Sequence, residues 1–161
     1  MNRTCKRSIR LALSLALMLL FHLSAVAAEC VIGSTENTTQ YLPLAPAKEY
    51  VYSEIIYDQE SLSSISAGST IQKIGFQGAT TEAGAVEEFD LYVANSNLNQ
   101  APSEHSDLSA MQHVYSGALT LEKFDGMGTV FEVAFDEEFV YSGGSLHLVA
   151  IAKMVTGTCY F

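Results

Sequence analysis

Tryptophan is absent from this 161-residue chain, and arginine is absent after Arg10. Of the eight basic residues, only four lysines lie beyond residue 28, against all 18 carboxylates, so residues 29–161 carry a formal charge of −14. Nucleic acids and anionic membrane surfaces bind proteins through Lys and Arg. The composition therefore argues against both as partners of this region.

Acidic residues are also absent from the first 28 positions, and the first one in the chain is Glu29. Four basic residues stand within the first ten positions, followed by an apolar run over residues 11–23 and small residues over 24–28. This order is typical of a secretory signal peptide, and the run is shorter than the roughly 20 residues of a spanning helix, which is the alternative. We expect residues 1–28 to be removed. Residues 29–161 are then one secreted domain without a membrane span, located in the periplasm, at the cell surface or outside the cell.

Cysteine is scarce, with three in the chain. Cys5 lies in the expected signal peptide, which leaves Cys30 and Cys159 at opposite ends of the domain. In an oxidising compartment two cysteines can form one bridge, and the alternative is two unpaired thiols. We expect a Cys30–Cys159 disulfide, which requires the two ends of the domain to lie side by side.

Long helical patterns are lacking, and period-2 alternation of apolar and polar residues predicts strands instead. The candidate strands are residues 50–57, 70–77, 88–94, 114–121, 131–135 and 145–152. Turn signals separate them at residues 66–69, 78–84, 95–102, 125–128 and 142–144. One-turn helices are expected only after Asp58 and Asp107. This spacing predicts an all-β fold, an antiparallel β-sandwich in a single domain.

Seven segments of the chain form an ordered pattern of core strands and turns. They are residues 32–35, 52–57, 68–76, 89–93, 114–117, 135–143 and 146–149. Pro43 lies between the first and second segments, and Leu62 between the second and third. In this order they resemble the jelly-roll β-sandwich modules of secreted and cell-surface proteins of the Bacteroidetes, which often precede fibronectin type III repeats and are related to cleaved-adhesin domains. The resemblance runs over nearly all of residues 29–161 and implies a sandwich of jelly-roll type.

Modules of this kind are associated with adhesion and carbohydrate binding. The resemblance therefore implies an adhesin-like module that binds a glycan or a protein at a surface. The alternative is a structural subunit of a fimbrial or surface assembly, whose sheet edges pair with neighbouring molecules.

Catalytic motifs are missing from the sequence. It has no Gly-x-Ser-x-Gly elbow, no phosphate-cradling glycine loop and no His-x-x-x-His pair. His105 and His113 lie in or beside a polar loop, and His147 lies inside an apolar strand, where a hydrogen-bonded structural histidine is expected. We therefore expect no enzymatic activity.

The many carboxylates of residues 29–161 suggest calcium as a candidate bound ion. Calcium takes six to eight oxygen ligands from carboxylates and loop carbonyls, and Asp125, Asp136 and Glu138 are weak candidates for it. The alternative is acidity that serves solubility. We expect no other cofactor.

Ligand contacts are expected from exposed aromatic and polar side chains. Tyr92 and Tyr115 have the opposite parity to their apolar neighbours, which predicts that they face outward. Asn97 and Asn99 stand in the longest polar loop. These four residues are the candidate ligand-binding set, and the alternatives are buried tyrosines and a loop without a binding role.

Overall fold

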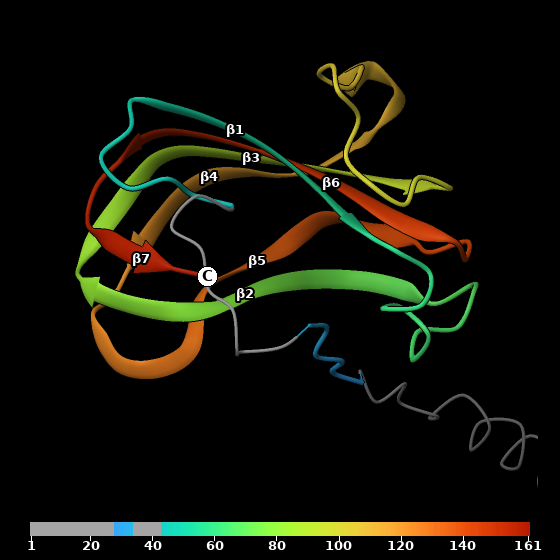
Figure 1. The fold of residues 1–161 in the computed structure, drawn as a ribbon, viewed down its shortest axis with the longest axis horizontal. Coiled ribbons are helices and arrows are strands. Elements are labelled where there is room, and N and C mark those ends of the chain that lie inside the picture. Colours follow the sequence, from blue (N-terminus) through green and yellow to red (C-terminus); the bar gives the residue numbers. More distant parts are fainter. Residues whose placement is uncertain (1–27, 34–42) are drawn as a thin grey trace, which may run out of the picture. The chain divides into compact units, whose positions relative to one another are not determined.

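Seven strands and one short 3-10 helix make up the secondary structure in the computed structural model, which describes residues 28–33 and 43–161, without the side chains of Phe124 and Asp125 (Figure 1). The strands are β1 (Tyr50–Tyr57), β2 (Thr70–Glu82), β3 (Gly84–Ser96), β4 (Gln112–Leu121), β5 (Phe124–Val140), β6 (Ser145–Val155) and β7 (Thr158–Tyr160), with the 3-10 helix η1 at Leu108–Ala110. All of them belong to the unit Val31–Phe161, and Met1–Cys30 is a separate unit. The expected signal peptide, apart from Ala28, lies outside the described residues.

Each expected strand is present, and several run further than the alternation indicated. The turn expected over residues 78–84 is wrong, because β2 continues to Glu82 and only Ala83 separates it from β3. The turn expected over 125–128 lies within β5, where Gly126 has a positive φ of 86°. Of the two expected one-turn helices, only that after Asp107 forms, as the 3-10 helix η1, and the Ser109 N–H donates to the Asp107 carboxylate. After Asp58 the chain makes hydrogen-bonded turns instead of a helix, although the Ser61 N–H donates to the Asp58 carboxylate.

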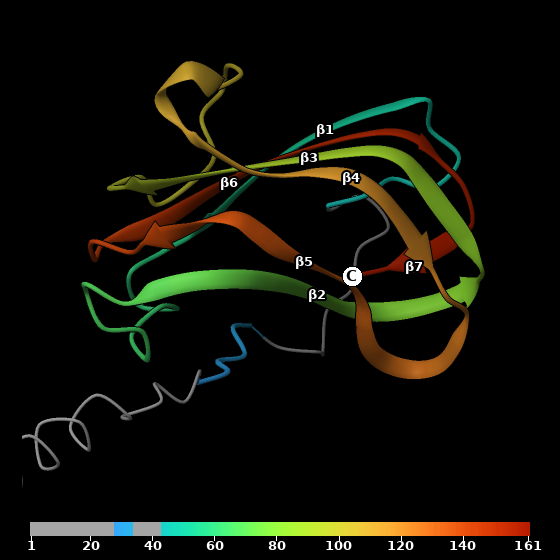
Figure 2. The ribbon, with the colours of Figure 1, turned by 180° about the vertical axis from the view of Figure 1, so that it is seen from behind.

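The strands form two antiparallel sheets, which confirms the all-β prediction. One has the order β1-β6-β3-β4 and the other β5-β2-β7. The pairs are nested along the chain: β3 pairs with β4, β2 with β5, and β1 with β6. Figures 1 and 2 show the sheets as two layers, with β5 and β2 facing the four-stranded sheet.

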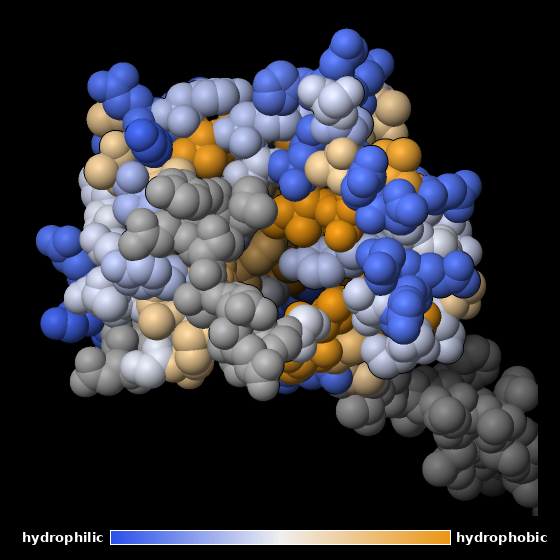
Figure 3. Space-filling view, viewed as in Figure 1, coloured by the Kyte–Doolittle hydropathy of each residue, from blue (hydrophilic) through white to orange (hydrophobic). Residues whose placement is uncertain are grey.

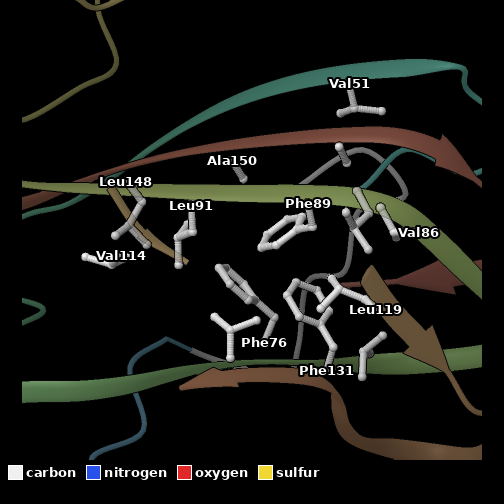
Figure 4. Close-up of a cluster of buried hydrophobic side chains, with 14 of the residues drawn as sticks. Val51, Phe76, Val86, Phe89, Leu91, Val114, Leu119, Phe131, Leu148 and Ala150 are labelled. Carbon is white, nitrogen blue, oxygen red and sulfur yellow. The ribbon is translucent and has the colours of Figure 1, made fainter. Parts of the chain in front are cut away.

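Aromatic and branched side chains from both layers fill the space between the sheets (Figure 4). Phe89 of β3 is fully buried, and its ring meets that of Phe131 of β5 at a centroid distance of 5.3 Å. Phe131 in turn stacks on Phe76 of β2 at 5.0 Å. These three rings join the two sheets, so the sandwich has one continuous core.

Three connections gather at the end of the sandwich where β1 and β3 finish and β6 begins, on the right of Figure 1. The amide of Asn95 fastens this end: its Nδ2 donates to the Val140 carbonyl at 3.0 Å, and its Oδ1 accepts from the Ser142 N–H at 2.8 Å. The hydroxyl of Tyr141, which is buried, donates to the Gly144 carbonyl at 2.6 Å. The β5–β6 connection, which passes from one sheet to the other, is thus fixed against β3 by side chains as well as by the pairing of β6 with β3.

Candidate functional site

A hollow of about 470 Å³ opens at this end of the sandwich. The β1–β2 connection supplies Asp58, Gln59 and Glu60, the β3–β4 loop supplies Asn97 and Asn99, and Ser145 stands at the start of β6. We call these six residues the end hollow. Figure 3 shows that hydrophilic residues dominate this end of the molecule, while apolar residues gather towards the middle of the same face.

All six residues that line the end hollow have polar side chains. Carboxylates accept hydrogen bonds, amides both donate and accept, and a hydroxyl does either. Binding pockets for apolar ligands are lined mainly by hydrophobic and aromatic side chains, which this hollow lacks among its six residues. It is therefore suited to a ligand with many hydroxyl or amide groups.

Asp58 is held in place by the turn that it caps. Its Oδ1 accepts from the Ser61 N–H at 2.8 Å, and the Leu62 N–H donates to its backbone carbonyl at 3.1 Å. Hydrogen bonds from the backbone and side chain of Ser61 lower the pKa of the Asp58 carboxyl. The group therefore stays ionised at neutral pH and serves as an acceptor.

Asn97 lies against the β5–β6 connection. A Cβ added at Gly144, where φ is +83°, would lie 2.8 Å from the Ser96 carbonyl oxygen and 3.3 Å from the Asn97 Oδ1. Ser145, the next residue, is nearly fully buried and pairs with Ser96 across β3 and β6. The glycine thus allows the β5–β6 connection to approach the base of the β3–β4 loop closely.

Tyr92 lies on the outer face of the four-stranded sheet, as expected from its parity, and not at the end hollow. Its ring stacks on that of His113 with centroids 4.5 Å apart and planes 22° apart. His113 Nε2 lies 2.9 Å from the Asp90 Oδ1. This half-exposed group joins β3 to β4.

Tyr115 does not face outward, which corrects the prediction from its parity. β4 has one extra residue opposite β3, because Leu91 pairs with Tyr115 while Tyr92 pairs with His113. A one-residue shift moves every following side chain to the other face of a sheet. Tyr115 therefore packs against the core beside Phe89, with ring centroids 6.2 Å apart.

The calcium candidates do not form a visible cluster. Asp136 and Glu138 are exposed on β5, and Glu138 accepts a hydrogen bond from Gln72 Nε2 at 2.7 Å. The side chain of Asp125 lies outside the description. Within residues 28–33 and 43–161, no three His, Cys, Asp or Glu side chains are arranged to hold a metal ion.

The predicted disulfide is not formed in the structure. Cys159 is a fully buried thiol on β7, and burial raises its pKa to about 11. Cys30 is exposed. The bridge between them stays a prediction for the oxidised protein.

The four candidate ligand residues thus separate into two groups. Asn97 and Asn99 come together in the end hollow, whereas Tyr92 and Tyr115 lie elsewhere on β3 and β4. The sequence reasoning missed the other residues of the hollow, which are Asp58, Gln59, Glu60 and Ser145. Their signal was position, since polar residues directly after one strand and at the start of another meet when those strands share an end of a sandwich.

Comparison of the chain with protein families, with curated proteins and with solved structures finds no match. None of the helices in the part of the chain that the structure describes is long and apolar enough to cross a membrane.

Proposed function

We propose that this chain is a secreted, non-catalytic β-sandwich of jelly-roll type that binds a surface glycan in the end hollow. The observation that carries the proposal is the hollow itself, about 470 Å³ lined by six polar side chains from separate segments. Sugar hydroxyls both donate and accept hydrogen bonds, which matches carboxylates and amides set side by side.

The strand order supports the jelly-roll part of the proposal. A jelly roll winds one long antiparallel ribbon into two sheets. The nested pairs β1 with β6, β2 with β5 and β3 with β4 describe such a ribbon, and strands β1, β2 and β3 alternate between the sheets, as do β4, β5 and β6.

The state of Asp58 does not suit it to be the general acid of a glycosidase. A glycosidase needs one carboxyl with a raised pKa, which holds a proton for the leaving group. The Ser61 hydrogen bonds lower the pKa of Asp58. This carboxylate is thus equipped to accept hydrogen bonds from a ligand and not to donate a proton to one.

A glycan array probed with the purified protein tests the proposal. Asn97→Ala and Asn99→Ala should each weaken binding about 3- to 10-fold, the effect of losing roughly one neutral hydrogen bond. Gln100→Ala is the matched control, because Gln100 is an exposed amide of the same loop that does not line the hollow. Silence of the array, or equal loss in the control, would overturn the glycan site, and hydrolysis of a bound glycan would overturn the non-catalytic assignment.

The second candidate is a structural subunit of a surface assembly. Its support is that β1 and β4 form the two edges of the four-stranded sheet, over eight and ten residues. Exposed edges can add a strand from a neighbouring molecule. Oligomers that grow with protein concentration in light scattering, combined with a silent array, would favour this role over glycan binding.

A further inference from the structure

A buried carboxylate and a buried histidine lie on the outer face of the four-stranded sheet, away from the core. Glu54 of β1 and His147 of β6 have side chains only 10% and 7% exposed, and His147 Nε2 lies 3.2 Å from Glu54 Oε1. Polar groups are expensive to bury without partners. Their burial on a face that would otherwise meet solvent requires a cover.

The cover is the β3–β4 connection, residues 97–111, which we call the outer loop. Figures 1 and 2 show it standing on the outer side of the four-stranded sheet. The Ser106 N–H of this loop donates to the same Glu54 Oε1 at 3.2 Å. The His105 ring meets the Tyr52 ring edge to face, with centroids 4.0 Å apart.

Val149 shows that the cover is tight. It is the neighbour of Glu54 on one side and of Tyr92 on the other, so it points to the outer face, yet it is fully buried and lies outside the core cluster. The pKa of the Tyr52 hydroxyl is raised, first by burial and then by the charge of Glu54. The ionisation of Tyr52 is therefore sensitive to the charge of Glu54, the carboxylate beneath the loop.

We infer that Glu54 and His147 are positioning residues that anchor the outer loop and thereby set Asn97 and Asn99 at the end hollow. The inference rests on the proposed function for its ligand, but the anchor itself acts in the free protein. Glu54 Oε1 receives one donor from the loop and one from the sheet, so a single oxygen joins the two. Because a carboxylate oxygen accepts hydrogen bonds, we assign the donor role in this contact to His147 Nε2.

Amide hydrogen exchange of the full-chain protein without ligand tests the anchor. In Glu54→Ala the amides of residues 97–111 should exchange at least tenfold faster, while those of β3 and β6 stay protected. His147→Val should do the same, because it removes the donor. His147→Gln, whose side-chain amide can still donate, should restore slow exchange, and Glu54→Gln, which keeps an acceptor for Ser106, should be intermediate.

The matched control is Asp90→Ala. Asp90 and His113 form the same kind of pair on the same face, but they join β3 to β4 and are more exposed, at 27% and 43%. This variant should leave exchange of the outer loop unchanged. Equal acceleration in the control, or unchanged exchange in both Glu54→Ala and His147→Val, would overturn the anchor.

Two further measurements connect the anchor to its surroundings. In Glu54→Gln, ultraviolet titration should show one tyrosine ionising at lower pH than in the wild type, because the charge that raises the Tyr52 pKa is gone. Affinity for the glycan identified on the array should fall at least tenfold in Glu54→Ala and recover in His147→Gln relative to His147→Val. A wild-type protein that binds no glycan would refute the proposed function alone, whereas unchanged loop exchange would refute the anchor alone.

Discussion

The ring of Tyr115 lies over Gly117, two residues further along β4. A Cβ added at Gly117 would come within 2.7 Å of the tyrosine hydroxyl oxygen and 3.1 Å of Cζ. The hydroxyl donates to the Ala118 carbonyl at 3.3 Å, and this hydrogen bond holds the ring in its position over Gly117. β4 is an edge strand, and an aromatic ring beside a glycine stabilises edge strands in this way.

Gly117→Ala should therefore destabilise the protein by about 1 kcal/mol, the usual value of one hydrogen bond, since the ring must move and the bond to Ala118 is lost. Urea unfolding measures the change. Gly75→Ala in β2 is the control, because the nearest atom to its added Cβ is 3.4 Å away, and it should stay within about 0.5 kcal/mol of the wild type. Equal effects in the two variants would show that the Tyr115 ring is not fixed.

Phe89→Ala should be the most damaging of these substitutions. The ring is fully buried and contacts the opposite sheet through Phe131, so its loss leaves a cavity between the layers. A cost of about 3 to 5 kcal/mol is expected by thermal or urea unfolding. Leu98→Ala, at a side chain 43% exposed, should change stability by less than about 0.5 kcal/mol.

Gly144→Ala should destabilise the end of the sandwich more than Gly126→Ala. Both glycines have positive φ, which costs other residues roughly 1 to 2 kcal/mol. Only at Gly144 does the new Cβ also meet backbone, 2.8 Å from the Ser96 oxygen. The difference between the two variants in the free energy of unfolding, measured in urea, gives the cost of the contact with Ser96. Equal free energies of unfolding would show that this contact has no cost.

Cys159 should resist modification while the protein is folded. In reduced protein at pH 8, iodoacetamide should label Cys30, which is exposed, and label Cys159 only after unfolding. Peptide mapping distinguishes the two sites. Rapid labelling of Cys159 in the native protein would contradict its burial.

The same thiol predicts how stability depends on pH. Its pKa rises to about 11 in the fold, above the roughly 8.5 of an unperturbed cysteine, so the folded state keeps the proton to higher pH than the unfolded chain. This contribution is complete below about pH 8.5 and is lost as the pH rises towards 11. The decline in unfolding free energy over that window should be shallower in Cys159→Ala than in the wild type.

Strand positions could be predicted because one face of each strand meets the core. Residues such as Phe89, Leu91 and Val93 alternate with polar neighbours, and local alternation is visible in a sequence. The orientation of Tyr115 could not be predicted from local alternation. The extra residue in β4 reverses the parity, and the pairing with β3 that reveals it depends on residues more than twenty positions away.

The site could be predicted only where the sequence presents it as one segment. Asn97 and Asn99 share a polar loop, so they were found together. Asp58 and Ser145 are 87 positions apart in the numbering and meet only through the pairing of β1 with β6. Glu54 and His147 are joined by that same pairing, and His147 was expected to be a hydrogen-bonded structural histidine without an identified partner.

The place of β6 in the four-stranded sheet has a consequence for the order in which the chain can fold. This strand lies between β1 and β3, although it is the sixth in sequence, and Tyr50 pairs with Lys153. When the chain emerges from the N-terminus onward, β1 and β3 are therefore present long before the neighbour that joins them. The four-stranded sheet is complete only when β6, which ends at Val155, has emerged. A chain truncated before β6 therefore lacks an inner strand of this sheet and not an edge strand. Such late, non-local pairing is characteristic of slow-folding β proteins.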